Sequence, residues 1–283
     1  AQKCMKKYFA KSQIEAIIQV STLTKPLYRS LFSVAKKHHV PLILVASRSL
    51  THLRCSERFL KCDVQEYNNT ALPQNYIFKD YYSTKVFDDF PDLRAKTYVG
   101  SRFIMKDIEI NNDDNRPVAL FILFNHRKDV SFKLLEAVSR LNTIQNFDTV
   151  IYRCHPSFLF NWETIYKAFP EKEIIDNTGR DYSVLLNYRI IAVSGPTTAA
   201  LEAITYGSLV HWTPFVYDDA ILMDDVMNQI GTKCNSIREL RNNLHINLND
   251  RVLYKIALEK DRDTMNKYFQ TTSLISEQIK STV

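Results

Sequence analysis

The sequence predicts an α/β fold with two Rossmann-like domains that face a central cleft. Apolar, β-branched segments alternate with amphipathic segments along the chain, which is the pattern of parallel strands connected by helices. A polar segment of turn-forming residues, 106–116, divides this series into two halves and is the expected linker. Because ligands of such folds bind at the carboxyl ends of the strands, we expect a binding cleft between the halves.

The first half, residues 1–105, has the pattern of a small Rossmann-like domain. Its apolar segments predict strands at 14–20, 41–46, 63–67, 75–79 and 96–99. Its amphipathic segments predict helices at 27–37 and 81–89. With roughly 100 residues, this half is short for a complete domain. We therefore expect a short or incomplete fold that lacks its opening strands.

The second half, residues 117–283, repeats the alternation more regularly. The predicted strands are 118–124, 148–153, 173–175, 190–193 and 209–212. The predicted helices are 130–141, 162–169, 182–186, 221–229, 237–244 and the C-terminal segment. In the first of these helices, the stripe expected to face the sheet consists of Phe132, Leu135, Val138 and Leu141. The alternation predicts a second Rossmann-like domain followed by C-terminal helices.

The charge and hydropathy of the chain limit the classes of ligand and partner that we expect it to bind. The 283 residues carry a formal charge of +6, spread over small clusters without a long basic run. This distribution suits an anionic small ligand or a membrane surface and gives no indication of nucleic acid. No segment reaches the ~18 consecutive apolar residues of a membrane-spanning helix, and residues 1–30 lack a signal-peptide pattern. We expect a cytoplasmic protein, with peripheral association at the inner face of the membrane left open.

No metal site and no disulfide framework are expected. The five cysteines are irregularly spaced and include no CxxC pair: Cys4, Cys55, Cys62, Cys154 and Cys234. The acidic stretch 217–225 admits two interpretations, a metal site or a solvated helix face, and its helical spacing favours the second.

The segment from Ser194 to Gly207 has the pattern of an anion-binding helix start. It follows an apolar strand with a small turn, Ser194-Gly195, and Pro196 suits the first position of the helix. Thr197 and Thr198 then lie beside backbone N–H groups that have no partner within the helix, the arrangement that holds phosphate. Glu202 lies one turn further on the same face. The alternative is that Ser194 only caps the helix and Glu202 is a solvated helix residue.

Two other predicted strands also end in polar clusters. Asn125 to Lys128 follow the strand at 118–124, and Cys154 to Ser157 follow the strand at 148–153. The first cluster supplies Arg127 and Lys128 as candidate phosphate ligands, and the second supplies His155 and Pro156. If these strands are neighbours, cations, a histidine and hydroxyls converge on one edge of the sheet, which would suit a phosphorylated ligand.

These motifs resemble the donor-binding domain of GT-B glycosyltransferases. The matching residues are Tyr152-Arg153-Cys154-His155-Pro156, then Ser194 to Thr198 with Leu201-Glu202-Ala203 and Gly207, and upstream 76–82, 90–93 and 99–103. The chain is most similar to bacterial surface-polysaccharide enzymes that use CMP- or CDP-activated donors, such as sialyltransferases, polysialyltransferases, Kdo transferases and glycerophosphotransferases. The resemblance implies that His155 and Pro156, and later Ser194, Gly195, Thr197, Thr198 and Glu202, contact the donor nucleotide and its phosphate. It departs from the family at Gly195-Pro196, where a plainer pair of hydroxyl residues is expected.

The resemblance implies a metal-independent glycosyltransferase without a cofactor, acting on a nucleotide-sugar donor and a glycan or glycolipid acceptor. It implies that residues 1–105 form the acceptor-side domain and that residues 117–283 form the donor-binding domain. His155 would hydrogen-bond or protonate the leaving phosphate, and the first half would supply the base, for which His52 and Asp80 are the candidates. The alternatives are a UDP-sugar transferase or epimerase of the same fold, or a non-catalytic nucleotide-binding module of a larger polymerase.

Overall fold

The chain divides into two compact units, residues 1–103 with 268–283 and residues 104–267. The computed structural model describes residues 14–21, 33–46, 75–78, 97–99, 115–141, 147–195, 197–217 and 228–269. The strand predicted at 63–67, the helix predicted at 81–89 and most of the helix predicted at 221–229 lie outside these residues. The domain boundaries at 105, 106–116 and 117 stay a prediction.

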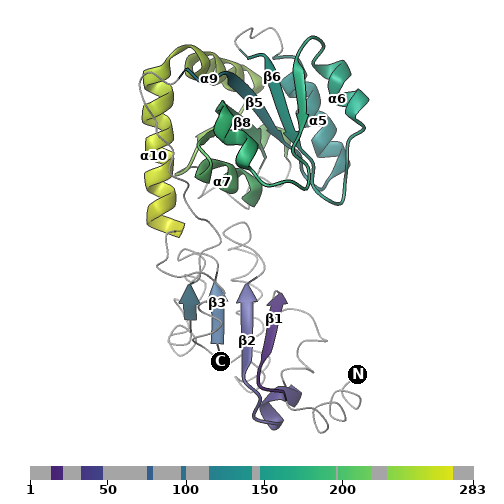
Figure 1. Ribbon diagram of the computed structural model, residues 1–283, viewed down its shortest axis with the longest axis vertical. Helices are drawn as coiled ribbons and strands as arrows, with labels where there is room; N and C mark the ends of the chain where they lie inside the picture. Colours follow the sequence, from purple (N-terminus) through teal and green to yellow (C-terminus); the bar gives the residue numbers. More distant parts are fainter. Residues whose placement is uncertain are drawn as a thin grey trace. The chain divides into compact units, whose positions relative to one another are not determined.

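The first unit contains a parallel sheet whose strands follow one another in sequence order (Figure 1). Its strands are β1 (Ile17–Ser21), β2 (Leu42–Ala46), β3 (Asn75–Phe78) and β4 (Thr97–Val99). A helical segment, 33–37, precedes β2 and buries Val34 and Ala35, while β2 buries Leu42, Ile43 and Val45. The apolar runs in the sequence therefore form a parallel sheet, as expected.

The second unit contains a six-stranded parallel sheet in the order β10-β9-β8-β5-β6-β7. Its strands are β5 (Val118–Leu123), β6 (Thr149–Arg153), β7 (Glu173–Asp176), β8 (Arg189–Ser194), β9 (Ser208–Trp212) and β10 (Thr232–Lys233). The chain builds outward from β5 to β7, returns to the other side of β5 with β8, and continues to β10. This is the strand order of a Rossmann fold, and the direction reverses between β5 and β8.

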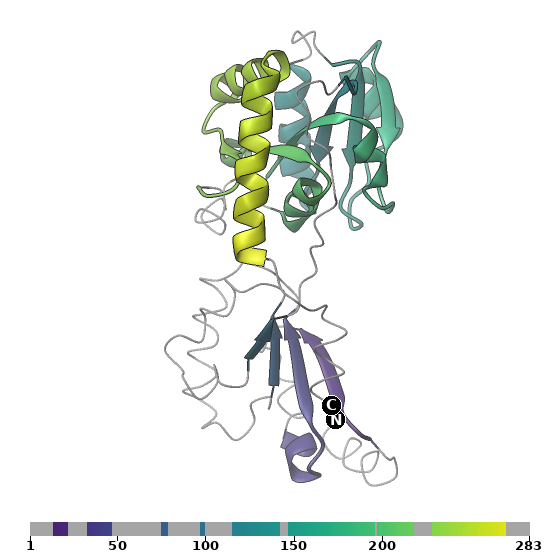
Figure 2. The ribbon, with the colours of Figure 1, turned by 60° about the vertical axis from the view of Figure 1, so that its left-hand side comes forward.

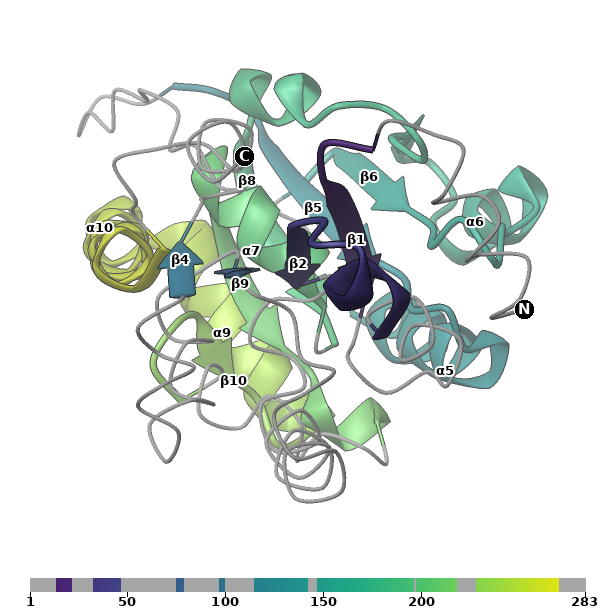
Figure 3. The same ribbon diagram turned by 90° about the horizontal axis from the view of Figure 1, so that it is seen from below.

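Helices cover both faces of this sheet (Figures 1 and 2). They are α5 (Lys128–Ser139), α6 (Trp162–Ala168), α7 (Thr198–Thr205), α9 (Ile237–Asn249) and α10 (Arg251–Phe269), with short 3₁₀ segments η2 (Ser183–Asn187) and η3 (Pro214–Val216). The views in Figures 1 and 3 place α5 and α6 next to each other, and their residues are in contact. Among the described residues, no helix is long and apolar enough to cross a membrane.

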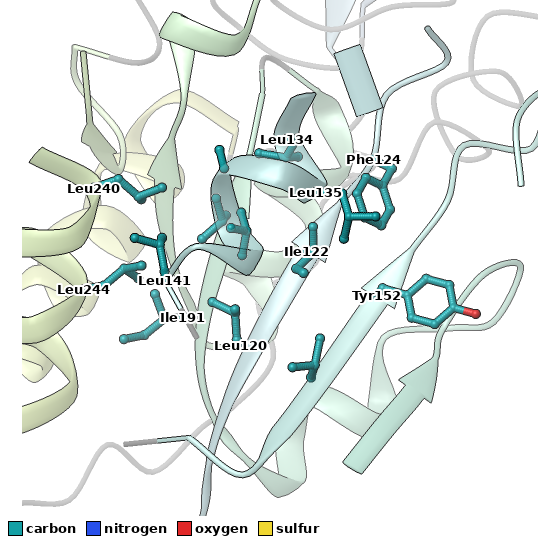
Figure 4. Packing of buried hydrophobic residues seen from close by; sticks show 14 of the residues in the cluster. Leu120, Ile122, Phe124, Leu134, Leu135, Leu141, Tyr152, Ile191, Leu240 and Leu244 are labelled. Carbon is teal, nitrogen blue, oxygen red and sulfur yellow. The ribbon is translucent and has the colours of Figure 1, made fainter. Parts of the chain in front are cut away.

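Alternate residues of β5 pack against opposite faces of the sheet. Leu120 and Ile122 join a core with Leu134 and Leu135 of α5 and residues of α9 (Figure 4). Phe121 points the other way, where its ring lies 6.2 Å from that of Tyr182. Because β5 is buried on both faces, its sequence is an unbroken apolar run.

Three expectations about the helices of this unit need correction. Phe132 does not face the sheet but is 41% exposed, and α5 instead buries Val130, Ser131 and Leu134 with the other core residues. The helix expected at 182–186 is the 3₁₀ segment η2. The helix expected at 237–244 continues to Asn249, held at its start by a capping box in which Ser236 and Glu239 satisfy backbone N–H groups.

Candidate active site

Three polar loops begin at the same level of the second sheet. The register pairs Leu123 at the end of β5 with Arg153 of β6 on one side and with Ser194 of β8 on the other. The loops that follow these three strands therefore leave the same carboxyl edge side by side. They flank the point between β5 and β8 where the strand order reverses, which is where open α/β sheets bind ligands.

The loop after β5 is fixed by its own hydrogen bonds. The Asn125 backbone N–H donates to the Ser131 Oγ at 3.1 Å, and the Ser131 hydroxyl donates to the Asn125 carbonyl at 3.0 Å. The Asn125 side-chain oxygen also accepts from the Arg127 N–H at 3.0 Å. These bonds hold the exposed His126 in place between two anchored residues.

The two cations of this loop have nearby partners on α5. Arg127 forms an ion pair with Asp129 at 2.8 Å, and the hydrogen bond from Arg127 lowers the pKa of the Asp129 carboxyl. Lys128 begins α5, and its Nζ lies 5.9 Å from the centre of the Phe132 ring. Of these two predicted phosphate ligands, Arg127 is thus partly neutralised by a neighbouring carboxylate.

His155 lies in the exposed loop after β6, followed by Pro156. Its Nδ1 accepts the backbone N–H of Ser157 at 3.2 Å and lies 2.7 Å from the Ser157 hydroxyl. An N–H donor at Nδ1 requires the lone pair there, so the neutral ring carries its proton on Nε2. Burial, together with the charge of His126, lowers the pKa of His155.

His126 is the residue of this site that the sequence interpretation missed. Its ring centre lies 5.7 Å from that of His155, with the ring planes at 63°. From the sequence, only Arg127 and Lys128 of the cluster 125–128 are candidate ligands, and His126 is left out. The signal was present in the sequence, since His126 and His155 each stand two residues past the end of the predicted strands 118–124 and 148–153, which turn out to be neighbours.

The loop after β8 uses its polar groups within the fold. Ser194 is fully buried, and its hydroxyl donates to the Gly195 carbonyl at 2.8 Å. The Ser194 carbonyl accepts both the N–H and the hydroxyl of Thr213, at 2.9 and 3.1 Å. Ser194 therefore ties β8 to the end of β9.

Gly195 lies directly beneath the ring of Tyr217. A Cβ atom at Gly195 would stand 1.6 Å from Cζ of Tyr217, so no side chain fits there. Burial raises the pKa of the Tyr217 phenol, and a hydrogen bond with the Gly195 backbone opposes that effect. The glycine that departs from the family pattern thus accommodates an aromatic ring of this chain.

The start of α7 differs from the expected one. The helix begins at Thr198, and Thr197 is its N-cap, with an extended backbone and a side-chain oxygen that accepts from the Ala199 N–H at 3.3 Å. The expectations that Ser194 caps this helix and that Pro196 holds its first position are wrong, because Thr197 supplies the capping oxygen. Thr197, Thr198 and Glu202 are half-buried. The helix ends as expected at Gly207, whose φ is 84°.

Other residues considered from the sequence have structural partners or lie outside the described residues. Arg153 donates to the carbonyls of Asn177 and Arg180 at 2.9 and 2.6 Å and stacks over Tyr182. His211 is buried against Asn247, and burial lowers its pKa to about 4. His52, Asp80 and the acidic residues 218–225 fall outside the described part of the chain. Within that part, no three metal-ligating side chains come together.

Comparison with known proteins places the fold in one structural class. No protein-family model and no curated protein sequence matches the chain. Among solved structures, the GtfA/B complex matches with a TM-score of 0.62 at 11% identity, over 99% of this chain and 60% of that one. Anabaena HepE in complex with UDP matches with a TM-score of 0.58 at 11% identity, over 99% and 80%. CalG4, the calicheamicin glycosyltransferase, matches with a TM-score of 0.57 at 11% identity, over 99% and 76%.

The neighbours are GT-B glycosyltransferases, and this chain has the same fold of two Rossmann-like units. The chain spans about 60% of the length of the GtfA/B and TarM chains that it matches.

Proposed function

We propose that this protein is a glycosyltransferase that moves a sugar from a nucleotide-activated donor to a surface glycan or glycolipid acceptor. The observation that carries the proposal is the His126–His155 pair at the carboxyl edge of a Rossmann sheet with the GT-B strand order. Exposed imidazoles beside the reversal point of such a sheet are placed where a nucleotide phosphate is expected. The fold alone would not separate a transferase from a binding module, so the imidazoles carry the argument.

His155 is the proposed acid of the reaction. The acceptor hydroxyl oxygen forms a bond to the anomeric carbon of the sugar, and the bond from that carbon to the donor phosphate oxygen breaks. The acceptor proton passes to a base, for which His52 and Asp80 remain the candidates. The Nε2–H of the neutral His155 ring hydrogen-bonds the leaving phosphate, and when the ring is an imidazolium it donates this proton and returns to the neutral form. Lys128 with the first N–H groups of α7 offsets the charge of the phosphate.

Two donor classes fit this proposal. The resemblance around His155-Pro156 favours a cytidine-activated donor. Anabaena HepE and S. aureus TarM each match this chain in structures that contain UDP, which favours a uridine-activated donor. Both classes present a phosphate to the same edge of the sheet. A cytoplasmic protein, with peripheral association at the membrane surface, remains the expected location.

Thermal unfolding with CMP, CDP, UDP and GDP tests the proposal and separates the donors. A ligand that binds only the folded state adds about 2.7 kcal/mol of stability at 100 times its Kd, and in a chain of this size each kcal/mol raises Tm by roughly 2–4 °C. We expect a rise with cytidine or uridine nucleotides and none with GDP. Release of nucleotide from a matching activated sugar then demonstrates turnover. A protein that binds a nucleotide but releases none from any activated sugar would be a binding module.

A further inference from the structure

We propose that His126 and His155 form a proton-linked phosphate clamp, in which binding of the donor's phosphate adds a proton to the pair. This inference rests on the proposed function, because it concerns the same edge of the sheet. It assigns a second histidine to the site and makes nucleotide affinity depend on pH.

The geometry brings the two rings to one anion. They leave adjacent strands, β5 and β6, whose ends are paired through Leu123 and Arg153. Their centres are 5.7 Å apart, both side chains are exposed, and the planes are inclined at 63°. Because the ring centres are this close, one nitrogen of each ring can contact a different oxygen of the same phosphate group. The Ser157 N–H fixes the His155 tautomer, so that ring offers Nε2–H as its donor.

Binding of an anion reverses the effect that nearby charge has on protonation of the two imidazoles. In the free protein, two imidazolium ions this close repel each other, and this adds to burial in holding the pKa of His155 below its usual value. A phosphate that contacts both rings attracts both positive charges, so the protonated forms are favoured in the complex. The proton comes from solvent on binding, and the phosphate remains chemically unchanged in this step.

Other charged groups lie on the segments near the two histidines, within the part of the chain that the structure describes. They do not change the effect of an anion on protonation of the pair. They are Arg127, Lys128 and Asp129 at the start of α5, Arg153 at the end of β6, Asp176 at the end of β7, Glu163 at the start of α6 and Glu202 on α7. Arg153 is already bonded to the carbonyls of Asn177 and Arg180. Arg127 and Asp129 neutralise each other, and the Lys128 ammonium lies beside the Phe132 ring. Lys128 adds to the attraction for an anion.

Histidine NMR of the free protein tests the pairing before any ligand is added. We expect His126→Gln to raise the pH midpoint of His155, because the variant removes the Coulomb repulsion of a neighbouring imidazolium. His245→Gln is the matched control, since His245 is also exposed but lies on α9 beside Asn249. The control should leave the His155 midpoint unchanged. An unchanged midpoint in His126→Gln contradicts the pairing.

Calorimetry in two buffers of different ionisation enthalpy tests the clamp. With CMP, UDP and inorganic phosphate as probes, we expect uptake of close to one proton at pH 7, and affinity that strengthens by up to tenfold for each pH unit lowered. His126→Gln should lose most of this proton uptake, and His245→Gln should retain it. Nucleotide binding with equal proton uptake in wild type and His126→Gln overturns the clamp but leaves the glycosyltransferase proposal standing.

The remaining outcomes are also decisive. If phosphate raises the midpoints of both rings but no nucleotide binds, the clamp holds and the proposed function fails. If neither the nucleotides nor phosphate moves either midpoint, the clamp is overturned.

Discussion

The loops after β6 and β8 contain similar residue types, yet one exposes its polar side chain and the other uses its polar groups within the fold. The β6 loop presents His155 to solvent and pairs its ring with His126. In the β8 loop, Ser194 is buried, Gly195 lies under Tyr217 and Thr197 caps α7. Both loops thus leave the same carboxyl edge of the sheet. The polar side chain of the β6 loop points to solvent, whereas the polar groups of the β8 loop are used within the fold. A hydroxyl at a strand end is available to a ligand only where it is exposed and not already bonded within the fold, as the Ser194 hydroxyl is to the Gly195 carbonyl.

Removing one polar group from each loop tests whether only the β6 loop contributes to the reaction. We expect His155→Ala to lower the rate of nucleotide release by about 10²–10⁴-fold, because a positioned proton donor contributes that much. Ser194→Ala should leave the rate within about threefold of wild type, since its hydroxyl bonds only within its own loop. Steady-state assays with saturating donor measure both. Equal losses in the two variants would contradict the distinction between the loops.

The Tyr217 contact predicts a large stability effect at Gly195. We expect Gly195→Ala to destabilise the protein by about 3 kcal/mol, because the new methyl group meets the buried ring. Gly179→Ala is the matched control. Gly179 has a φ of 73° and open space around a Cβ, so only backbone strain of roughly 1 kcal/mol is expected. Urea unfolding measures both changes. Similar small values for the two variants would show that Tyr217 does not pack on Gly195.

The cap at the start of α7 gives a smaller effect. Thr197→Ala removes the oxygen that accepts the Ala199 N–H and should cost about 1 kcal/mol of stability. Thr198→Ala, one position into the helix, should cost less than about 0.5 kcal/mol. Unfolding curves and nucleotide titrations are recorded together. A Thr197→Ala variant with full stability and lost nucleotide affinity would return this hydroxyl to the phosphate site.

The smallest expected effect is a difference in nucleotide affinity between variants of the two cations in the β5 loop. Lys128→Gln should weaken nucleotide binding by about three- to tenfold, the loss of one charge-assisted contact near the surface. Arg127→Gln should weaken it less, because Asp129 already neutralises that guanidinium. Titration of both variants at one ionic strength measures the two affinities. A larger loss at Arg127 would mean that the ion pair opens in the complex.

The strands at the site followed from residue patterns, whereas their order in the sheet and the direction of their side chains did not. The apolar runs at β5, β6 and β8 located the buried parallel strands, because such strands must be apolar on both faces. A stripe at helical spacing did not distinguish Phe132, which is exposed on α5, from the buried residues of the same helix. The burial of Ser194 depends on Thr213 and Tyr217, which reach it only through the pairing of β8 with β9. The pairing of His126 with His155 likewise depends on the adjacency of β5 and β6.

A crystal structure with the nucleotide bound would show which of the strand-end loops holds the phosphate. We predict that a phosphate oxygen of the nucleotide lies within hydrogen-bond distance of Nε2 of His155, with His126 on the same phosphate. Ser194 should remain buried beneath the end of β9. A phosphate bound to the Ser194 hydroxyl, with His155 turned away into solvent, would contradict the account.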